Sequence, residues 1–221
     1  MTEPSEKSPN RGASAVELAY DGIIGLVLTG RLRPGERTSV YLLTDVLGIG
    51  RTPVREAINR LQSEGFLSVS GRSGTIVNPI DADRARQILA LRRCLECFAA
   101  DYAVANMTEE ALARISQAAE SLFAAGTTAA FVRANTDFHS GIVSLAGNPT
   151  LDRFYAQLQI QLTVAVYLAG RGENEAAESL RKQEHNAILT ALRAGDTEAL
   201  KRAINAHIDT TERAILSQVG D

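Results

Sequence analysis

The segment GIGRTPVREAINRLQSEGF, residues Gly48–Phe66, contains the clearest structural signals of the chain. Its middle predicts a helix, because apolar side chains recur at intervals of three and four residues and so share one face: Val54, Ala57, Ile58 and Leu61. Pro53 suits the first turn, where its missing N–H costs nothing, and Gly65 suits a left-handed C-cap. The opposite face is polar. A half-buried helix with arginine near its start is what a reader of the DNA major groove requires, although an ordinary amphipathic helix has the same pattern.

The flanking sequence predicts the elements that accompany this helix. One helix is expected over about residues 14–29 and another over Val40–Leu47, about three residues before the next helix begins. That spacing is typical of a helix-turn-helix. Two β-prone runs follow, Phe66–Ser70 and Thr75–Asn78, and they flank Gly-Arg-Ser-Gly as in a hairpin. Three helices and a hairpin with a basic tip form a winged helix, in which Arg72 can reach a phosphate or the minor groove.

The charge distribution favours nucleic acid over a membrane surface. The whole chain has a formal net charge of −3, which alone does not suggest a DNA-binding protein. Residues 31–73, however, contain seven arginines, no lysine and four acidic residues. Arginine is suited to binding phosphate and guanine. The basic character therefore lies within the predicted winged helix.

Composition limits the class of protein and its compartment. The chain has 221 residues, of which 45% are hydrophobic and 22% charged, an ordinary globular composition. Its apolar runs are too short to cross a bilayer. Residues 1–13 lack the apolar segment of a secretory signal, and their Ser, Pro, Glu and Lys content predicts a disordered lead-in. Cys94 and Cys97 form a C-x-x-C inside a helical pattern, so we expect two reduced thiols rather than a redox pair or a zinc site, in a cytoplasmic protein.

Residues 19–79 resemble the GntR family of bacterial transcription regulators. The likeness rests on GRLRPGE, on LGIGRTPVREAINRLQSEGFL and on the spacing within GRSGTIV. It implies DNA contacts at the start of the recognition helix and in the wing: Arg51, Thr52, Arg55, Arg72, Ser73 and Gly74. The chain departs from the family at Gly50, where a capping Ser or Thr is usual, although Gly costs little as a cap. Tyr41 and Leu42 are more apolar than the family pattern and indicate an additional packing or dimer contact.

From residue 81 onward the pattern is helical, and no β-prone run occurs. Helices with short connections predict an antiparallel six-helix bundle. The predicted fold is therefore mainly α, with a winged helix-turn-helix over residues 14–79 and an all-helical domain over residues 80–221. The first helix of the bundle, over about residues 81–105, carries a stripe that we expect to face the interior: Ile88, Leu91, Leu95, Phe98, Ala99 and Tyr102.

All three histidines of the chain fall in this second domain, each on the apolar face of a different helix: His139, His185 and His207. A single histidine in such a place is most often a hydrogen-bonded core residue. Three histidines that point into the same interior would leave several ring nitrogens in need of hydrogen-bond partners. A metal ion can bind one nitrogen of each ring. Asn135 lies one turn before His139 and can add an oxygen ligand.

The segments NTDFHSGIVSLAGNP, EHNAILTALRAGD and AHI resemble the FCD ligand-sensing domain of the FadR branch of the family. The resemblance implies a divalent-metal site at Asn135, His139, His185 and His207. The family often has Asp in place of Asn135, and a neutral amide is a weaker ligand for a hard cation; imidazole-rich sites favour zinc or nickel-like ions. Effectors of the branch are typically small organic acids, and by position Arg92 is the candidate to pair with their carboxylate. The alternative for Arg92 is a solvated helix residue.

We therefore predict a homodimeric, cytoplasmic regulator that is not an enzyme and that reads a palindromic operator in double-stranded DNA. A small organic acid, with a divalent metal, controls operator affinity, and we expect a repressor rather than an activator. Two alternatives remain: the metal is itself the signal, or the helical domain is a metal-dependent hydrolase. The hydrolase is disfavoured because we expect no carboxylate near the histidines except Asp137, which faces away from His139.

Overall fold

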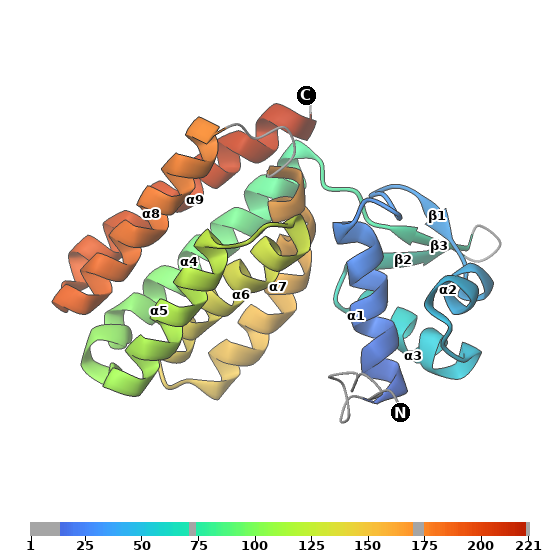
Figure 1. The fold of residues 1–221 in the computed structure, drawn as a ribbon, viewed down its shortest axis with the longest axis horizontal. Helices are drawn as coiled ribbons and strands as arrows, with labels where there is room; N and C mark the ends of the chain where they lie inside the picture. Colours follow the sequence, from blue (N-terminus) through green and yellow to red (C-terminus); the bar gives the residue numbers. More distant parts are fainter. Residues whose placement is uncertain (1–13, 71–73, 170–174, 220–221) are drawn as a thin grey trace, which may run out of the picture. The chain divides into compact units, whose positions relative to one another are not determined.

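The computed structural model describes residues 14–70, 74–169 and 175–219. They fall into two compact units, and the boundary along the chain lies between Asn78 and Pro79. Figure 1 shows the small sheet and its helices in the first unit and the helices of the second. The predicted lead-in and two predicted wing residues, Arg72 and Ser73, lie outside the described residues.

The helices of the first unit lie where the sequence predicts them. α1 (Ala15–Leu28) starts with a capping box, in which the Ser14 side chain and Glu17 satisfy each other's backbone N–H groups. α2 (Val40–Leu47) ends at Gly48, whose φ of 65° is in the left-handed region that favours glycine. α3 (Arg51–Ser63) then follows as the second helix of the helix-turn-helix. Local sequence signals thus suffice to place these helices.

The sheet of the first unit contains the predicted hairpin and one additional short strand. β2 (Leu67–Ser70) and β3 (Gly74–Val77) pair in antiparallel register. β1 (Arg37–Thr38) pairs with the other edge of β3, which gives the order β1-β3-β2. The sequence did not predict β1, because two residues are too few to show an alternating pattern.

The apolar face of α3 packs against α1 and α2 and leaves its polar face exposed. The predicted apolar residues are all buried: Val54, Ala57, Ile58 and Leu61. α1 and α2 approach closely at Gly22, where an added Cβ would lie 2.8 Å from the side chain of Leu47. This packing fixes α3 while its outer face remains exposed to solvent.

The described residues of the second unit form six helices: α4 (Ala82–Asn106), α5 (Glu109–Phe123), α6 (Thr128–Ser144), α7 (Pro149–Ala169), α8 (Glu175–Ala194) and α9 (Thr197–Val219). Side chains of Asp81, Thr108 and Thr127 cap the first three of these helices. α4 packs against α6, α7 and α9, and α8 packs against α5 and α9. The helical bundle predicted from the sequence is confirmed.

The predicted inward face of α4 is wrong in part. Ile88 and Ala99 are buried, but three large residues of the stripe are about half exposed: Leu91 at 49%, Phe98 at 44% and Tyr102 at 46%. The buried face consists largely of alanine, together with two charged residues that belong to the site described below. Small side chains let α4 approach its neighbouring helices closely. The prediction looked for large apolar side chains and therefore did not identify this alanine-rich face as the buried one.

Candidate metal centre

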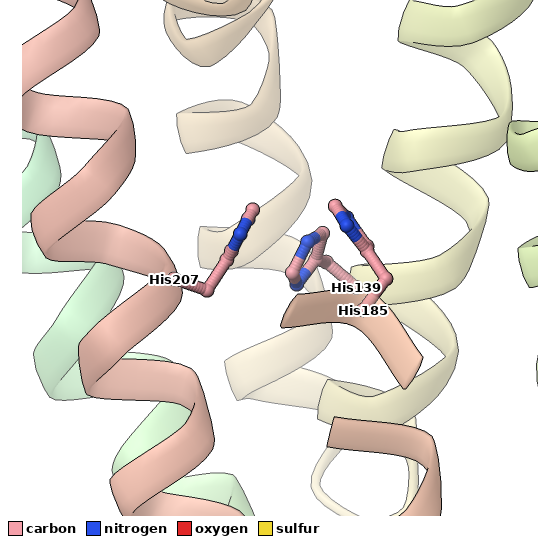
Figure 2. Close-up of side chains that lie close together, drawn as sticks. All are labelled: His139, His185 and His207. Carbon is pink, nitrogen blue, oxygen red and sulfur yellow. The ribbon is translucent and has the colours of Figure 1, made fainter. Parts of the chain in front are cut away.

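The three histidines of the chain converge in the interior of the second unit. His139 comes from α6, His185 from α8 and His207 from α9. All three are buried, and ligand nitrogens from the three rings lie within 4.8 Å of one another. Figure 2 shows the rings turned toward one another from separate helices. We call these three residues the histidine centre.

A second contact orients each ring. Nδ1 of His139 lies 3.2 Å from Oε2 of Glu96, and Nδ1 of His207 lies 3.1 Å from Oε2 of Glu184. Nδ1 of His185 lies 2.8 Å from the carbonyl oxygen of Arg181. Because carbonyl and carboxylate oxygens accept hydrogen bonds, each Nδ1 carries the proton and each Nε2 presents a lone pair. Metal-binding histidines in proteins are held by the same kind of second contact.

The three Nε2 atoms need a partner that the described protein atoms do not supply. Nε2 of His139 and Nε2 of His207 are buried and have no hydrogen-bond partner among the described residues. Nε2 of His185 lies 3.2 Å from Oδ1 of Asn135, yet both atoms are acceptors with this tautomer and this amide orientation. Buried acceptors without donors are costly. A cation between them would satisfy them together, so these residues fit a metal ion.

Burial keeps the imidazoles of the histidine centre neutral. It lowers the pKa of His139, and the positive charge of Arg92 lowers that pKa further. The pKa values of His185 and His207 lie well below the usual value, chiefly because of burial and then because of neighbouring histidine and arginine side chains. Neutral imidazole is the form that binds a metal ion. The rings are therefore in the metal-binding form at neutral pH.

Arg92 belongs to a buried charged network beside the histidine centre and is not a solvated residue. It is 1% exposed, and its Nε donates to Oε1 of Glu96 at 2.6 Å. The hydroxyl of Tyr155 donates to the same oxygen at 2.5 Å. Burial raises the pKa of Glu96, but Arg92 and His139 outweigh it and bring that pKa below its usual value. Nη2 of Arg92 has no hydrogen-bond partner among the described residues, which leaves a buried donor available to a ligand oxygen.

Our expectation that Asp137 is the only carboxylate near the histidines is wrong. Glu96 and Glu184 each contact a histidine ring. Glu96 lies four residues after Arg92, the spacing of a helical ion pair, and that signal was present in the sequence. Glu184 gave no such signal, because it contacts His207 on a different helix. Both carboxylates bind Nδ1, on the side of the ring away from Nε2, so they orient the rings.

The exposed side of α3 carries the residues that the family resemblance assigns to DNA. Arg51, Thr52 and Arg55 are all exposed in the first turns of this helix. Gly50 occupies the N-cap without a side-chain hydrogen bond. The guanidinium of Arg51 lies over the ring of Tyr41, with 4.5 Å between Cζ and the ring centroid. Tyr41 is itself 68% exposed, so the pair lies on the surface beside the recognition helix.

Of the three predicted wing contacts, the structure describes Gly74, the first residue of β3. This residue has a φ of 79°, and a Cβ there would lie 3.0 Å from the carbonyl oxygen of Thr38. Glycine is therefore required by the backbone at this position. Arg72 and Ser73, the other predicted wing contacts, precede it outside the described residues.

The two cysteines are free thiols on α4. Cys94 is exposed and Cys97 is half-buried. Burial is the main cause that raises the pKa of Cys97, which disfavours a reactive thiolate. This agrees with two reduced thiols that take no part in the histidine centre.

Both units match known families. The model of bacterial regulatory proteins of the gntR family matches residues 16–77, and that of the FCD domain matches residues 87–210. The HTH-type transcriptional regulator McbR of Escherichia coli (strain K12) is 30% identical over 86% of each chain. The probable D-xylose utilization operon transcriptional repressor of Paenarthrobacter nicotinovorans is 29% identical over 85% of this chain and 83% of its own.

Solved structures give the same result. The structure of E. coli McbR/YncC has a TM-score of 0.82 and 25% identity, and covers 94% of this chain and 100% of its own. A putative GntR regulator from Rhodococcus sp. RHA1 has a TM-score of 0.77 at 22% identity, over 93% of this chain and 99% of its own, and supports the fold.

Fold and likeness together define a DNA-binding regulator of transcription, not an enzyme. The chain belongs to the GntR family, and its helical unit is the FCD domain found in FadR-type members. The resemblance found in the sequence is thus confirmed, and the hydrolase alternative is wrong. Among the described helices, none combines the length and apolar character needed to span a membrane.

Proposed function

We propose that this protein is a homodimeric repressor whose affinity for a palindromic operator is set by a small organic acid, bound with a divalent metal in the FCD domain. Two relatives support repression: the D-xylose operon protein and NanR of Citrobacter rodentium, 26% identical, are both named as repressors. An operator-binding protein acts where the chromosome lies, so we assign it to the cytoplasm.

The observation that carries the proposal is the set of inward-facing Nε2 atoms in the histidine centre. His139, His185 and His207 would hold the metal ion, with Oδ1 of Asn135 as an oxygen ligand. Imidazole and amide ligands suit zinc or a nickel-like ion better than magnesium or calcium. The bound ion would supply positive charge and coordination positions for a carboxylate. The contacts at each Nδ1 hold the rings in the orientation that such an ion requires.

Arg92 is the protein group best placed to bind the carboxylate of the acid. Its buried Nη2 is available, and its charge contributes to the lowered pKa of His139 and His207. Guanidinium and carboxylate form charge-assisted hydrogen bonds in a bidentate geometry. Arg92 also contacts Glu96, which in turn contacts His139 and Tyr155. A ligand on Arg92 would therefore act on a network that joins α4, α6 and α7.

Operator recognition would fall to α3 and the wing. Arg51, Thr52 and Arg55 would reach base edges and phosphates from the first turns of α3, while Arg72, Ser73 and Gly74 would contact the backbone or minor groove. The exposure of the three α3 residues supports this assignment. The ring of Tyr41 restricts the directions available to the Arg51 guanidinium, which lowers the entropy lost on binding.

A homodimer would present one recognition helix to each half of the palindrome. The exposed stripe of Leu91, Phe98 and Tyr102 on α4 offers a surface for a second copy. A two-fold axis brings the same patch of both subunits together, so an apolar stripe on one helix can pair with itself. Sedimentation velocity tests this component: a species of twice the chain mass of 23.7 kDa is expected, and a monomer at micromolar concentration contradicts it.

The function is tested with an operator recovered by in vitro selection from random DNA duplexes. Operator affinity is then measured by fluorescence anisotropy with zinc-loaded and chelated protein, with and without a panel of small organic acids. We expect at least one acid to change the affinity of the zinc-loaded protein by roughly 5- to 150-fold, and to have much less effect after chelation. A response to chelation but to no acid would identify the metal as the signal. If neither treatment changes the affinity, the proposed control is wrong.

A further inference from the structure

A pocket of about 210 Å³ opens where α5 ends, α6 begins and α8 passes both. Thr127, Phe131, Glu178, Arg181 and Lys182 are among the residues that line it. The volume is below that of pockets for drug-sized ligands, so a small molecule suits it. We call this the outer pocket. Neither the proposed metal ligands nor Arg92 lines it.

Successive turns of α6 and α8 lead from the outer pocket to the histidine centre. Phe131, Asn135 and His139 follow one another at intervals of four residues on α6, and Arg181 is four residues before His185 on α8. The guanidinium of Arg181 lies over the ring of Phe131, with 4.3 Å between Cζ and the centroid. One turn further, Nε2 of His185 lies 3.2 Å from Oδ1 of Asn135. Since a turn advances about 5.4 Å, the Arg181–Phe131 pair lies in the layer one turn outside the Asn135–His185 contact.

The charges of the outer pocket suit an anion. Arg181 and Lys182 both line it, and its acidic residue, Glu178, already pairs with Lys182 at 2.7 Å. α6 begins there with Thr127 as its cap and adds the positive end of the helix dipole. The charge of Arg181 also reaches the centre, since it contributes, after burial and other charges, to the lowered pKa of His207.

We propose that Arg181 and Phe131 form a closable entrance to the histidine centre, and that the Arg181 guanidinium binds the carboxylate of the entering acid. A carboxylate offers a guanidinium two charge-assisted hydrogen bonds, which the face of a phenyl ring does not. The acid therefore draws Arg181 away from Phe131 and opens the layer above Asn135 and His185. Arg92 cannot take this part, because it is 1% exposed and held by Glu96.

This inference rests on the proposed control by an organic acid and adds to it a second arginine and a route of access. It can be measured without DNA or metal, because the chain has three histidines and all three lie in the centre. Diethyl pyrocarbonate converts neutral imidazole to N-carbethoxyhistidine, whose absorbance can be followed. With metal-free, full-length protein, the rate of modification reports access to the histidine centre alone.

We expect Phe131→Leu and Arg181→Gln each to raise the modification rate by about tenfold, because either change removes the contact that closes the layer and so favours local opening. Lys182→Gln is the matched control: it removes a positive charge from the same pocket and helix but leaves the Arg181–Phe131 contact in place. Its rate should stay within about twofold of the wild-type rate.

Loss of stability would also expose the histidines, so a second control is needed. Leu151→Ala removes a buried side chain of α7 that does not line the outer pocket. Its modification rate shows how much faster the histidines react when the fold is destabilised but the Arg181–Phe131 contact is intact. All variants are compared at the same interval below their melting temperatures. If Phe131→Leu and Arg181→Gln react no faster than Leu151→Ala, the entrance is not at this pair.

The carboxylate contact is tested with acetate, succinate and tricarballylate as probes. At least one acid should change the wild-type rate, either by opening the entrance or by shielding the rings, and the change should be absent from Arg181→Gln. No change in the wild type, or the same change in Arg181→Gln, would show that Arg181 does not bind the acid. Because operator DNA plays no part, failure here is distinguishable from failure of the proposed regulation.

Discussion

The outer face of α3 and the histidine centre hold their functional side chains under opposite conditions. Arg51 and Arg55 project from an exposed surface, which gives their N–H groups access to solvent. The side chains of the histidine centre are buried away from bulk water, so a nitrogen without a partner is costly there. The Nε2 atoms that lack a hydrogen-bond partner among the described residues therefore point to a ligand. The exposed face of α3 gives no comparable indication of what binds to it.

The same difference predicts how substitutions act. A change in the buried network should alter the free energy of unfolding, because it leaves charges or polar atoms without partners. A change on the exposed face of α3 should leave stability almost untouched and alter only the affinity for DNA.

The largest expected effect is the loss of stability in Glu96→Ala. This carboxylate is fully buried and pairs with Arg92 at 2.6 Å, so its removal leaves a buried guanidinium without its partner. We expect the free energy of unfolding of the metal-free protein to fall by about 3–5 kcal/mol. Urea denaturation measures it, with Arg55→Ala as the exposed control, expected within about 0.5 kcal/mol of wild type. Equal losses of stability in Glu96→Ala and Arg55→Ala would show that the buried network is no more sensitive to substitution than the exposed face of α3.

Acidification should destabilise the metal-free protein through the histidine centre. The pKa values of His139, His185 and His207 are lowered by folding, so below the unfolded value of about 6.5 the unfolded chain binds protons that the folded chain does not. The free energy of unfolding should therefore fall as pH drops below about 6.5. Folding also lowers the pKa of Glu96, so the free energy of unfolding falls further as the pH drops below the ordinary pKa of a glutamate carboxyl. A melting temperature that stays constant between about pH 7.5 and pH 5 contradicts the buried, neutral histidines.

On the exposed face, Arg55→Ala should weaken operator binding by about 1–3 kcal/mol, the usual size of one bidentate base contact. Arg60→Ala is the matched control on the same helix. Arg60 lies over the ring of Tyr20 and pairs with Glu64, so its loss should change operator affinity much less. Anisotropy titrations with the selected operator give both values. If Arg60→Ala weakens binding as much as Arg55→Ala, the recognition face of α3 has been assigned wrongly.

The smallest effect concerns the cap of α3. Gly50 makes no side-chain hydrogen bond at the N-cap, and serine would supply one, although glycine is only a few tenths of a kcal/mol poorer at this position. Gly50→Ser should therefore raise the free energy of unfolding by about 0.2–0.5 kcal/mol. Differential denaturation against wild type resolves a change of that size, and a loss of stability would show that the site does not accept the hydroxyl.

The sequence was sufficient for the winged helix-turn-helix because its signals are local. The left-handed glycine at Gly65, the proline in the first turn of α3 and the apolar spacing lie within one segment, and the structure agrees with each. β1 was missed because its pairing with β3 depends on residues almost forty positions away.

In the FCD domain the sequence indicated the histidine faces but not the network around them. Glu96, Tyr155 and Glu184 contact partners on other helices, and only the packed fold brings those groups together. The half-exposed stripe of α4 was misassigned because helical spacing identifies an apolar face but not what covers it. The metal and the organic acid stay predictions, supported by the chemistry of the centre.

In the proposed function, ligands of the histidine centre control the affinity of the winged helix-turn-helix for DNA. The most direct test compares operator affinity in wild type and His207→Ala, each with and without zinc plus the acid that most stabilises the zinc-loaded wild type. We expect a change of roughly 5- to 150-fold in wild type and none in His207→Ala. Equal changes in the two proteins, or no change in either, would contradict it.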